Sequence, residues 1–303
     1  MGAPAFWELA VTAPGEAAEA LANFLWECGA LGVVEEEDGA GSRLRGFFRG
    51  DVAAAALRAR LTAYLDALRA LGVRVDGDVR LAPLADTAWA LAWREHFRPL
   101  AVGARLLVAP PWDVPADPGG RVLVVIEPGR AFGTGHHATT AGCLERLDAI
   151  LAEAPPPATA LDLGTGSGIL AIAAARLGVA RVLAVDDDPD AVACARANAA
   201  RNGVADRVDC RLADVARVDT DAPLVLANLL AAAHRRLAVA YRRLVRPGGR
   251  LVLGGVLDEE APAVGAALAA VGFVERARVT REGWTTLDFE ARSDRDAPVH
   301  DRA

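Results

Sequence analysis

Lysine is absent from this chain of 303 residues, and all 33 of its basic residues are arginine. Together with 29 glycines, 17 prolines and abundant alanine, this composition indicates a GC-rich genome more readily than a functional constraint. The 40 acidic residues give a formal net charge of −7, which argues against non-specific binding of nucleic acid. We therefore expect no direct contact with RNA or DNA.

Long apolar runs are absent as well. Every stretch of membrane-spanning length is interrupted by a charge, a glycine or a proline. The first ten residues, MGAPAFWELA, lack the basic start and the apolar stretch of a signal peptide. We expect a cytoplasmic protein with no membrane partner. Its hydrophobic content of 53% excludes general disorder.

Cysteine is scarce and scattered. Cys28, Cys143, Cys194 and Cys210 form no C-x-x-C pair. We interpret them as small buried side chains in a reducing compartment. No cysteine or carboxylate cluster lies beside the chain's adjacent histidines, so we expect no bound metal.

The hydrophobic pattern divides the chain into four parts. Residues 1–80 show strand and helix patterns in the order β-α-β-β-α-β, which is typical of a small ferredoxin-like α+β domain. Residues 81–96 are rich in tryptophan and are predicted to form a connector helix. Residues 97–293 alternate apolar strands with helices and end in a hairpin, which predicts an α/β domain with a mainly parallel sheet covered on both faces. Residues 294–303 are predicted to be a polar tail.

The segment LDLGTGSGIL runs from a predicted strand through three glycines into a helix. Such a turn brings backbone N–H groups and a helix N-terminus close to a ligand. A dinucleotide-binding fingerprint would place its third glycine where Ile169 stands. The spacing is instead G-x-G-x-G, with Gly164 and Gly166 following the acid Asp162. This arrangement suits a ligand that has an ammonium group and no pyrophosphate.

Two further polar residues end predicted strands of the same domain. Asp186 ends the next strand, 22 residues after Gly164, where a carboxylate can accept hydrogen bonds from both hydroxyls of a ribose. Asp187 and Asp188 are alternatives, although Asp188 more readily caps the following helix. Asn228 ends the fourth strand, where α/β enzymes place groups that contact ligands. A polar cap of the next helix is the other interpretation of Asn228.

A second glycine-rich segment, EPGRAFGTGHHATT, precedes the first helix of the C-terminal domain. Its adjacent histidines cannot easily share one tetrahedral metal ion. A phosphate cradle is disfavoured because the P-loop lysine is missing. Thr139 or Thr140 can act as a plain cap of the helix that follows.

Taken together, these motifs resemble those of the ribosomal protein L-eleven methyltransferases of the PrmA type. The resemblance spans the whole chain, including the connector WALAWREHFRPL and the segments FGTGHHATT, LDLGTGSG, NLL and RPGGRLVLGGVL. It implies a Rossmann-like class I methyltransferase domain, a ferredoxin-like N-terminal domain and S-adenosyl-L-methionine as cofactor. The segment ANLL lacks the Pro-Pro-aromatic sequence of glutamine- and adenine-methylating enzymes, which argues against those two groups.

The resemblance also implies roles for individual residues. Phe132 would cover the cofactor, and Thr134 and Thr140 would form hydrogen bonds with it. The residues expected to bind the cofactor are Phe132, Thr134, Thr140, Asp162, Gly164, Gly166, Asp186 and Asn228. For catalysis, Asn228 would accept a hydrogen bond from the amine, and His136 or alternatively His137 would relay its proton.

The activity implied by the resemblance is methylation, up to trimethylation, of lysine ε-amines and of the N-terminal α-amine of a large-subunit ribosomal protein, L-eleven, free or in the ribosome. Residues 1–80 would hold this substrate. Another protein or a small-molecule amine is an alternative substrate. A nicotinamide-dependent oxidoreductase is disfavoured by Ile169. A non-catalytic ribosome-assembly factor is disfavoured by the intact residues Gly164, Gly166, Asp186 and Asn228.

Overall fold

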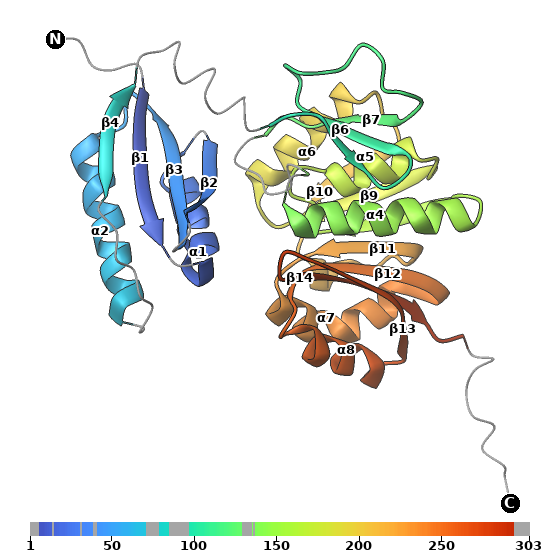
Figure 1. Ribbon diagram of the computed structural model, residues 1–303. Helices are drawn as coiled ribbons and strands as arrows, with labels where there is room; N and C mark the ends of the chain where they lie inside the picture. The colour runs from blue at the N-terminus through green and yellow to red at the C-terminus, as the bar shows by residue number, and fades with distance from the viewer. Residues whose placement is uncertain are drawn as a thin grey trace, which may run out of the picture. The chain divides into compact units, whose positions relative to one another are not determined.

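The chain forms two compact units, Met1–Arg98 and Pro99–Ala303 (Figure 1). The computed structural model describes residues 6–13, 15–30, 32–38, 41–70, 79–84, 97–128, 135 and 137–293. Within these residues, none of the helices is long and apolar enough to cross a membrane. Most of the predicted connector and the whole predicted tail lie outside the described residues.

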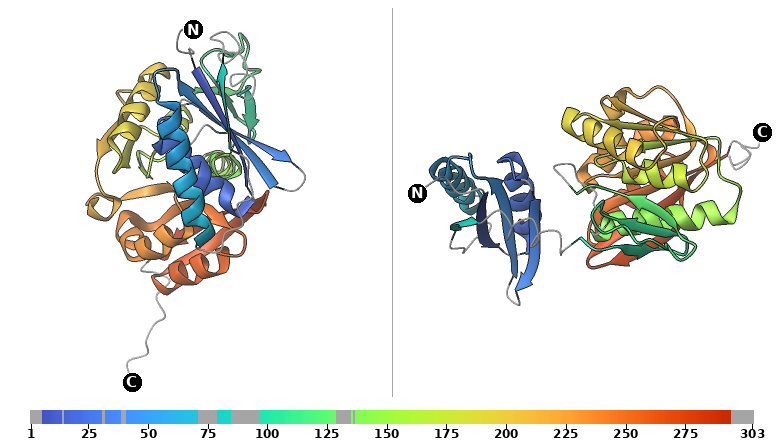
Figure 2. Two further views of the ribbon diagram at one scale, coloured as in Figure 1. Left: turned by 90° about the vertical axis from the view of Figure 1, so that its left-hand side faces the viewer. Right: turned by 90° about the horizontal axis from the view of Figure 1, so that it is seen from above.

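The N-terminal unit is a sheet with two helices on one face (Figure 2). Its strands follow the order β2-β3-β1-β4, and all neighbouring pairs are antiparallel, as in the split β-α-β arrangement. β4 ends at Leu84, so residues 81–84 of the predicted connector belong to this sheet. The elements described in this unit are β1 (Phe6–Ala13), α1 (Gly15–Glu27), β2 (Gly32–Asp38), β3 (Gly41–Arg49), α2 (Ala54–Ala70) and β4 (Arg80–Leu84).

The core of this unit follows from the two periodicities of its sequence. In β1, Leu9 and Val11 are two residues apart and therefore point to the same face of the sheet, toward the helices. α2 buries leucines at every fourth position, which places them on one helix face: Leu57, Leu61 and Leu65. Between the helices, Phe24 stacks on Tyr64 with ring centroids 4.1 Å apart.

The C-terminal unit is built on a mixed sheet. Over residues 159–291, which are described without a gap, seven strands follow the order β10-β9-β8-β11-β12-β14-β13. The first five are parallel, and β14 is antiparallel to both of its neighbours. The predicted α/β class, the mainly parallel sheet and the closing hairpin are confirmed. The sequence did not predict that β14 lies between β12 and β13.

Three short strands, β5, β6 and β7, form a separate small sheet in the described part of residues 99–128. β5 has only three residues. The elements of the whole unit are β5 (Leu100–Val102), β6 (Leu106–Ala109), β7 (Val122–Val125), α4 (Ala138–Glu153), β8 (Thr159–Leu163), α5 (Ile169–Arg176), β9 (Arg181–Asp186), α6 (Pro189–Arg201), β10 (Val208–Leu212), the 3-10 turn η2 (Val215–Arg217), β11 (Ala222–Asn228), α7 (Ala231–Leu244), β12 (Val245–Leu257), α8 (Ala261–Ala270), β13 (Phe273–Arg281) and β14 (Trp284–Ala291).

Helices cover both faces of the large sheet (Figure 1). α4, α5 and α6 contribute to one hydrophobic cluster, and α7 and α8 contribute to another. Successive residues of β8 alternate between them, with Ala160 in the first cluster and Leu161 and Leu163 in the second. Because both faces of the sheet are buried at its centre, the central strands β8 and β11 are mostly apolar, whereas the outer strands β10 and β13 carry exposed polar residues.

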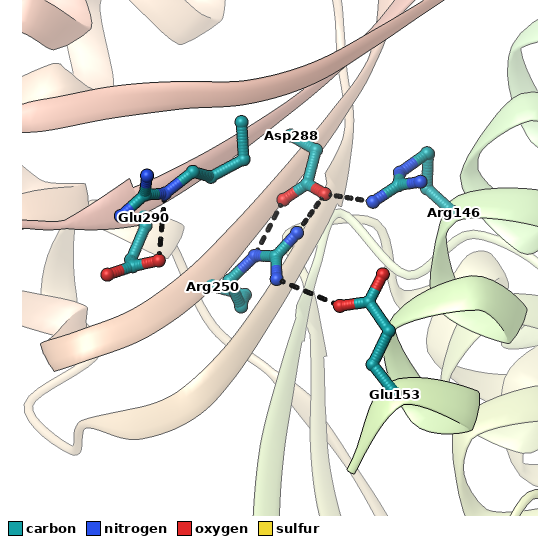
Figure 3. A network of polar contacts seen from close by, with 6 residues as sticks. Arg146, Glu153, Arg250, Asp288 and Glu290 are labelled. Carbon is teal, nitrogen blue, oxygen red and sulfur yellow. Dashed lines mark hydrogen bonds and ion pairs between the residues drawn. The ribbon is translucent and has the colours of Figure 1, made fainter.

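Ion pairs fasten α4 to the sheet (Figure 3). Asp288 of β14 is fully buried, and it accepts hydrogen bonds from Arg146 of α4 at 2.5 Å and from Nε of Arg250 of β12 at 3.0 Å. Glu153, at the end of α4, lies 3.6 Å from Nη1 of Arg250. These contacts hold the C-terminal half of α4, so its first turn has a fixed position above the ends of β11 and β12.

Candidate active site

A left-handed turn connects β8 to α5. Gly164 has φ of +72°, which favours glycine because a side chain there would be strained. A Cβ atom on Gly164 would also lie 2.4 Å from a methyl carbon of Leu229, the residue after Asn228. The N–H groups of Gly164 and Thr165 both donate to the carbonyl of Val185 in β9 at 2.9 Å. The loop is therefore tied to β9 on one side and closely packed against the end of β11 on the other.

Asp162, two residues before this turn, is fully buried. Its Oδ2 accepts hydrogen bonds from the Thr165 hydroxyl at 2.6 Å and from the Ala171 N–H at 3.1 Å. Its Oδ1 is buried and has no hydrogen-bond partner among the described residues. The pKa of Asp162 is raised to about 6, chiefly by burial and to a smaller extent by the charge of Asp186, whereas the hydrogen bonds from Thr165 and Ala171 lower it. A cationic ligand group beside Oδ1 would stabilise the ionised form.

Asp186 lies at the end of β9, beside the glycine loop. Its Oδ2 accepts a hydrogen bond from the Gly166 N–H at 2.9 Å, and its Oδ1 accepts one from the Asp188 N–H at 3.1 Å. Asp188 caps α6 by accepting from the Asp190 N–H at 2.8 Å, as predicted. The structure thus brings Asp162, Gly166 and Asp186 together at the carboxyl ends of β8 and β9. Their contacts with a cofactor stay a prediction.

Asn228 ends β11 and is paired in register with Gly254 of β12. Its Nδ2 donates to the hydroxyls of Thr139 and Thr140, both at 3.3 Å. Its Oδ1 is buried and has no hydrogen-bond partner in the described part of the chain. The N-cap of α7 is Leu230, which forms no side-chain cap. The interpretation of Asn228 as a helix cap is therefore wrong.

The first turn of α4 supplies the groups that Asn228 contacts. The N-cap of this helix is His137, whose side chain accepts from the Thr139 N–H, so neither Thr139 nor Thr140 is the cap. The Nδ1 of His137 also lies 2.8 Å from the Thr139 hydroxyl. The imidazole packs edge-on against the indole of Trp284, with centroids 5.2 Å apart.

A buried histidine supports Gly254 from the other side. His234 Nε2 lies 2.8 Å from the Gly254 carbonyl, and Nδ1 lies 2.9 Å from the Tyr241 hydroxyl. Burial lowers the pKa of His234 to about 4, although hydrogen bonds to the carbonyls of Gly254 and Leu229 oppose this shift. The imidazole is therefore neutral at physiological pH, and it holds the segment beside Asn228 in place.

The remaining predicted site residues fall into two groups. Phe132, Thr134 and His136 lie outside the described residues. Thr140 is fully buried, and its hydroxyl contacts Asn228. The predictions made from the sequence considered Thr139 only as a helix cap and did not include Gly254. Two adjacent glycines in the strand pattern LVLGGVL are a signal of close backbone approach, which would have drawn attention to Gly254.

Comparison with known proteins assigns these motifs to one family. Residues 5–292 match the family described as ribosomal protein L11 methyltransferase (PrmA). A ribosomal protein L11 methyltransferase from Methylococcus capsulatus is 41% identical over 300 residues, which cover 92% of this chain and 97% of that protein. The corresponding protein from Trichlorobacter lovleyi is 38% identical, with 85% and 88% covered. The crystal structure of a ribosomal protein L11 methylase from Lactobacillus delbrueckii subsp. bulgaricus is similar with a TM-score of 0.60 at 28% identity, and the match covers 65% of this chain and 100% of that one.

Proposed function

We propose that this chain, which belongs to the ribosomal protein L11 methyltransferase (PrmA) family, methylates amines of ribosomal protein L11 with S-adenosyl-L-methionine as the methyl donor. One observation from the structure supports this proposal above all. Two buried oxygens without a partner among the described residues, Asp162 Oδ1 and Asn228 Oδ1, belong to the neighbouring parallel strands β8 and β11. One suits the ammonium group of the cofactor, and the other suits an N–H of the amine.

The residues of the site fit the cofactor. Asp162 is a buried acceptor for its ammonium group, Gly164 allows the left-handed turn that places the side-chain-free backbone of Gly166 beside Asp186, and Asp186 offers a carboxylate for its ribose hydroxyls. The cofactor supplies a methyl group bound to a positively charged sulfur. The protein mainly has to hold two reactants in line, because the reactive group comes with the cofactor.

Asn228 directs the nucleophile in this proposal. A lysine amine has an ordinary pKa near ~10.4, so it must lose a proton and its hydration shell before it can attack. An N–H of the neutral amine then donates to Asn228 Oδ1, and its lone pair faces the methyl group. A monomethylated amine still has one N–H after deprotonation, whereas a dimethylated amine has none. Asn228 therefore directs the first two transfers, and the shape of the site directs a third.

The substrate amines that we propose are lysine ε-amines and the N-terminal α-amine of L11, each methylated up to three times. The proposal places the enzyme in the cytoplasm, where its substrate is made, and leaves both free L11 and the ribosome as substrate forms. The names of the relatives support L11 as the substrate. The number of methyl groups added to each amine, and the choice of amines, rest on the resemblance of the motifs to those of the family.

Intact-mass spectrometry tests the function directly. Recombinant bacterial L11 incubated with this enzyme and S-adenosyl-L-methionine should gain mass in steps of one methyl group, up to multiples of three. Fragmentation of the product would locate the modified amines. An Asn228→Ala variant serves as the control for contaminating activity. An unchanged L11 mass, with cofactor binding confirmed by titration, would contradict L11 as the substrate and leave the cofactor assignment standing.

We assign substrate recognition to the N-terminal unit. A variant lacking residues 1–98 should bind the cofactor nearly as tightly as the full chain, because the residues that form the cofactor site belong to the other compact unit. Its kcat/KM for L11 should fall by about 100-fold or more, equivalent to about 3 kcal/mol of lost substrate binding. Calorimetric titration and methylation assays measure the two quantities, and circular dichroism controls for folding. Full activity of a folded, truncated enzyme would rule out this role.

A further inference from the structure

We infer that His137 and Thr139 form a directional hydrogen-bond chain that turns the Asn228 amide so that its oxygen faces the substrate amine. The inference rests on the proposed function of Asn228 and assigns positioning roles to two residues of the first turn of α4. It starts from a property of the amide group. An asparagine side chain has a donor end and an acceptor end of almost the same shape, so something must determine which end faces the substrate.

Threonines alone do not determine this direction. Asn228 Nδ2 lies 3.3 Å from the hydroxyls of both Thr139 and Thr140. A hydroxyl can donate or accept, so two threonines would serve either end of an amide equally well. The direction of the Asn228 amide therefore depends on what the hydroxyls themselves are bonded to.

His137 fixes the direction of the Thr139 hydroxyl. As the N-cap of α4, it accepts a hydrogen bond from the Thr139 N–H at Nδ1, with a separation of 3.4 Å. A nitrogen that accepts has no proton of its own, so the neutral imidazole carries its proton on Nε2. The Thr139 hydroxyl lies 2.8 Å from the same Nδ1 and must donate to it. Its oxygen is left as an acceptor, which Nδ2 of Asn228 can use and Oδ1 cannot.

The opposite side of the amide leaves room for the acceptor oxygen. A Cβ atom on Gly254 would lie 2.7 Å from Asn228 Oδ1, and one on Gly255 would lie 3.3 Å from it. The missing side chains leave space for Oδ1 between these glycines, and this buried oxygen has no hydrogen-bond partner within the described residues. The chain of donors thus runs from Asn228 Nδ2 through Thr139 to His137, and it leaves Oδ1, beside Gly254 and Gly255, as the acceptor end of the amide.

The test compares substitutions of His137 that are compatible with an N-cap but differ in whether the side chain can accept hydrogen bonds from Thr139. His137→Asn retains a side-chain oxygen that can accept from the Thr139 N–H and hydroxyl, whereas His137→Gly removes it. Asparagine and glycine are both tolerated at an N-cap, so both variants should fold. Thr139→Ser and Thr139→Val form a second pair, with and without the hydroxyl. The assay is single-turnover methylation of bacterial L11, accompanied by cofactor titration and KM.

His137→Gly and Thr139→Val should lower the single-turnover rate by about tenfold to 100-fold, which is the cost typical of a misplaced catalytic group. The affinity for S-adenosyl-L-methionine and the KM for L11 should change by no more than about twofold, since the amide direction affects only the attacking amine. His137→Asn and Thr139→Ser should recover most of the rate. A wild-type rate in His137→Gly would overturn the inference. So would a loss in His137→Asn as large as that in His137→Gly, because the imidazole itself would then be needed.

A spectroscopic measurement tests the chain without the reaction. Nitrogen-15 NMR of the imidazole rings, assigned by comparison with His137→Asn, should show the His137 tautomer with its proton on Nε2 in the ligand-free protein. A proton on Nδ1 would overturn the inference. If the wild-type enzyme failed to methylate L11, the proposed function would fail, and the NMR result would still decide the direction of the chain.

Discussion

Replacing Asp162 with asparagine should stabilise the ligand-free protein and weaken its binding of S-adenosyl-L-methionine. The stabilisation follows from the raised pKa of this fully buried carboxyl group, about 6 against an ordinary 3.8. A carboxyl group with a raised pKa contributes stability below its unfolded pKa and loses that contribution as the pH rises through its folded pKa. Above pH 6 the ionised form therefore costs folding free energy, on the order of 3 kcal/mol for two pKa units.

The asparagine variant avoids most of that cost. Its side-chain oxygen can still accept from Thr165 and Ala171, as Oδ2 of Asp162 does, and it has no charge to desolvate. We expect a gain of about 1–3 kcal/mol in the free energy of unfolding at pH 7.5. Urea unfolding between pH 4 and pH 8 measures it. The difference between wild type and variant should shrink as the pH falls from 6 to 4.

Cofactor binding should change in the opposite direction. In the variant an NH₂ group occupies the position of Oδ1, and a donor there repels the ammonium group of the cofactor. A lost charge-assisted hydrogen bond costs about 1.5–3 kcal/mol, or about 10- to 150-fold in Kd. Wild-type affinity should decline below pH 6, as Asp162 takes up a proton, while the affinity of the variant should vary little with pH.

Calorimetric titration across this pH range measures both effects. Asp209→Asn, which removes an exposed negative charge from the same unit, is the matched control and should leave both quantities unchanged. An Asp162→Asn protein that is less stable than wild type would contradict the cost assigned to the buried charge, and one that binds the cofactor with wild-type affinity would show that Asp162 has a purely structural role.

The residues of the cofactor end of the site could be predicted from the sequence because their motifs are short and contiguous. A strand, a glycine turn and a helix follow one another in LDLGTGSGIL, and Asp186 ends the next strand at a spacing typical of such sheets. The match to the PrmA family confirms the resemblance that these motifs suggested. The full burial of Asp162 could not be predicted from the sequence, because it depends on residues packed around it from several elements.

The amine end of the site depends on contacts that no local pattern contains. Thr139 and Asn228 are 89 positions apart, and they meet because α4 covers the face of the sheet at the end of β11. The place of β14 between β12 and β13 is equally non-local, because a hairpin pattern does not tell which of its strands joins the sheet. Asn228 looked like a possible cap because the sequence alone cannot show whether its side chain points along the chain or across the sheet.

Removing the carboxylate of Asp288 should destabilise the C-terminal unit by about 3–5 kcal/mol, which is the usual cost of breaking a buried ion pair. Asp288 is fully buried, whereas Arg146 and Arg250 are 15% and 20% exposed (Figure 3). In Asp288→Ala both guanidinium groups would lose a common partner and remain largely out of water. Urea unfolding of this variant measures the cost. Asp288→Asn keeps an acceptor oxygen and should lose less.

An exposed ion pair provides the matched control. Asp221 and Arg246 lie 3.0 Å apart with side chains about half exposed, so Asp221→Ala should cost only about 0–1 kcal/mol. Equal costs for the two alanine variants would contradict the role of Asp288.

The substitution of Asp288 should also affect the active site, because Asp288 anchors the helix whose first turn orients Asn228. At a temperature where Asp288→Asn is still folded, its methylation rate should therefore fall while its cofactor affinity is retained. A rate that stays at the wild-type value would mean that the first turn of α4 is held by its own contacts with β11 and β12, independently of the ion pairs at the other end of the helix.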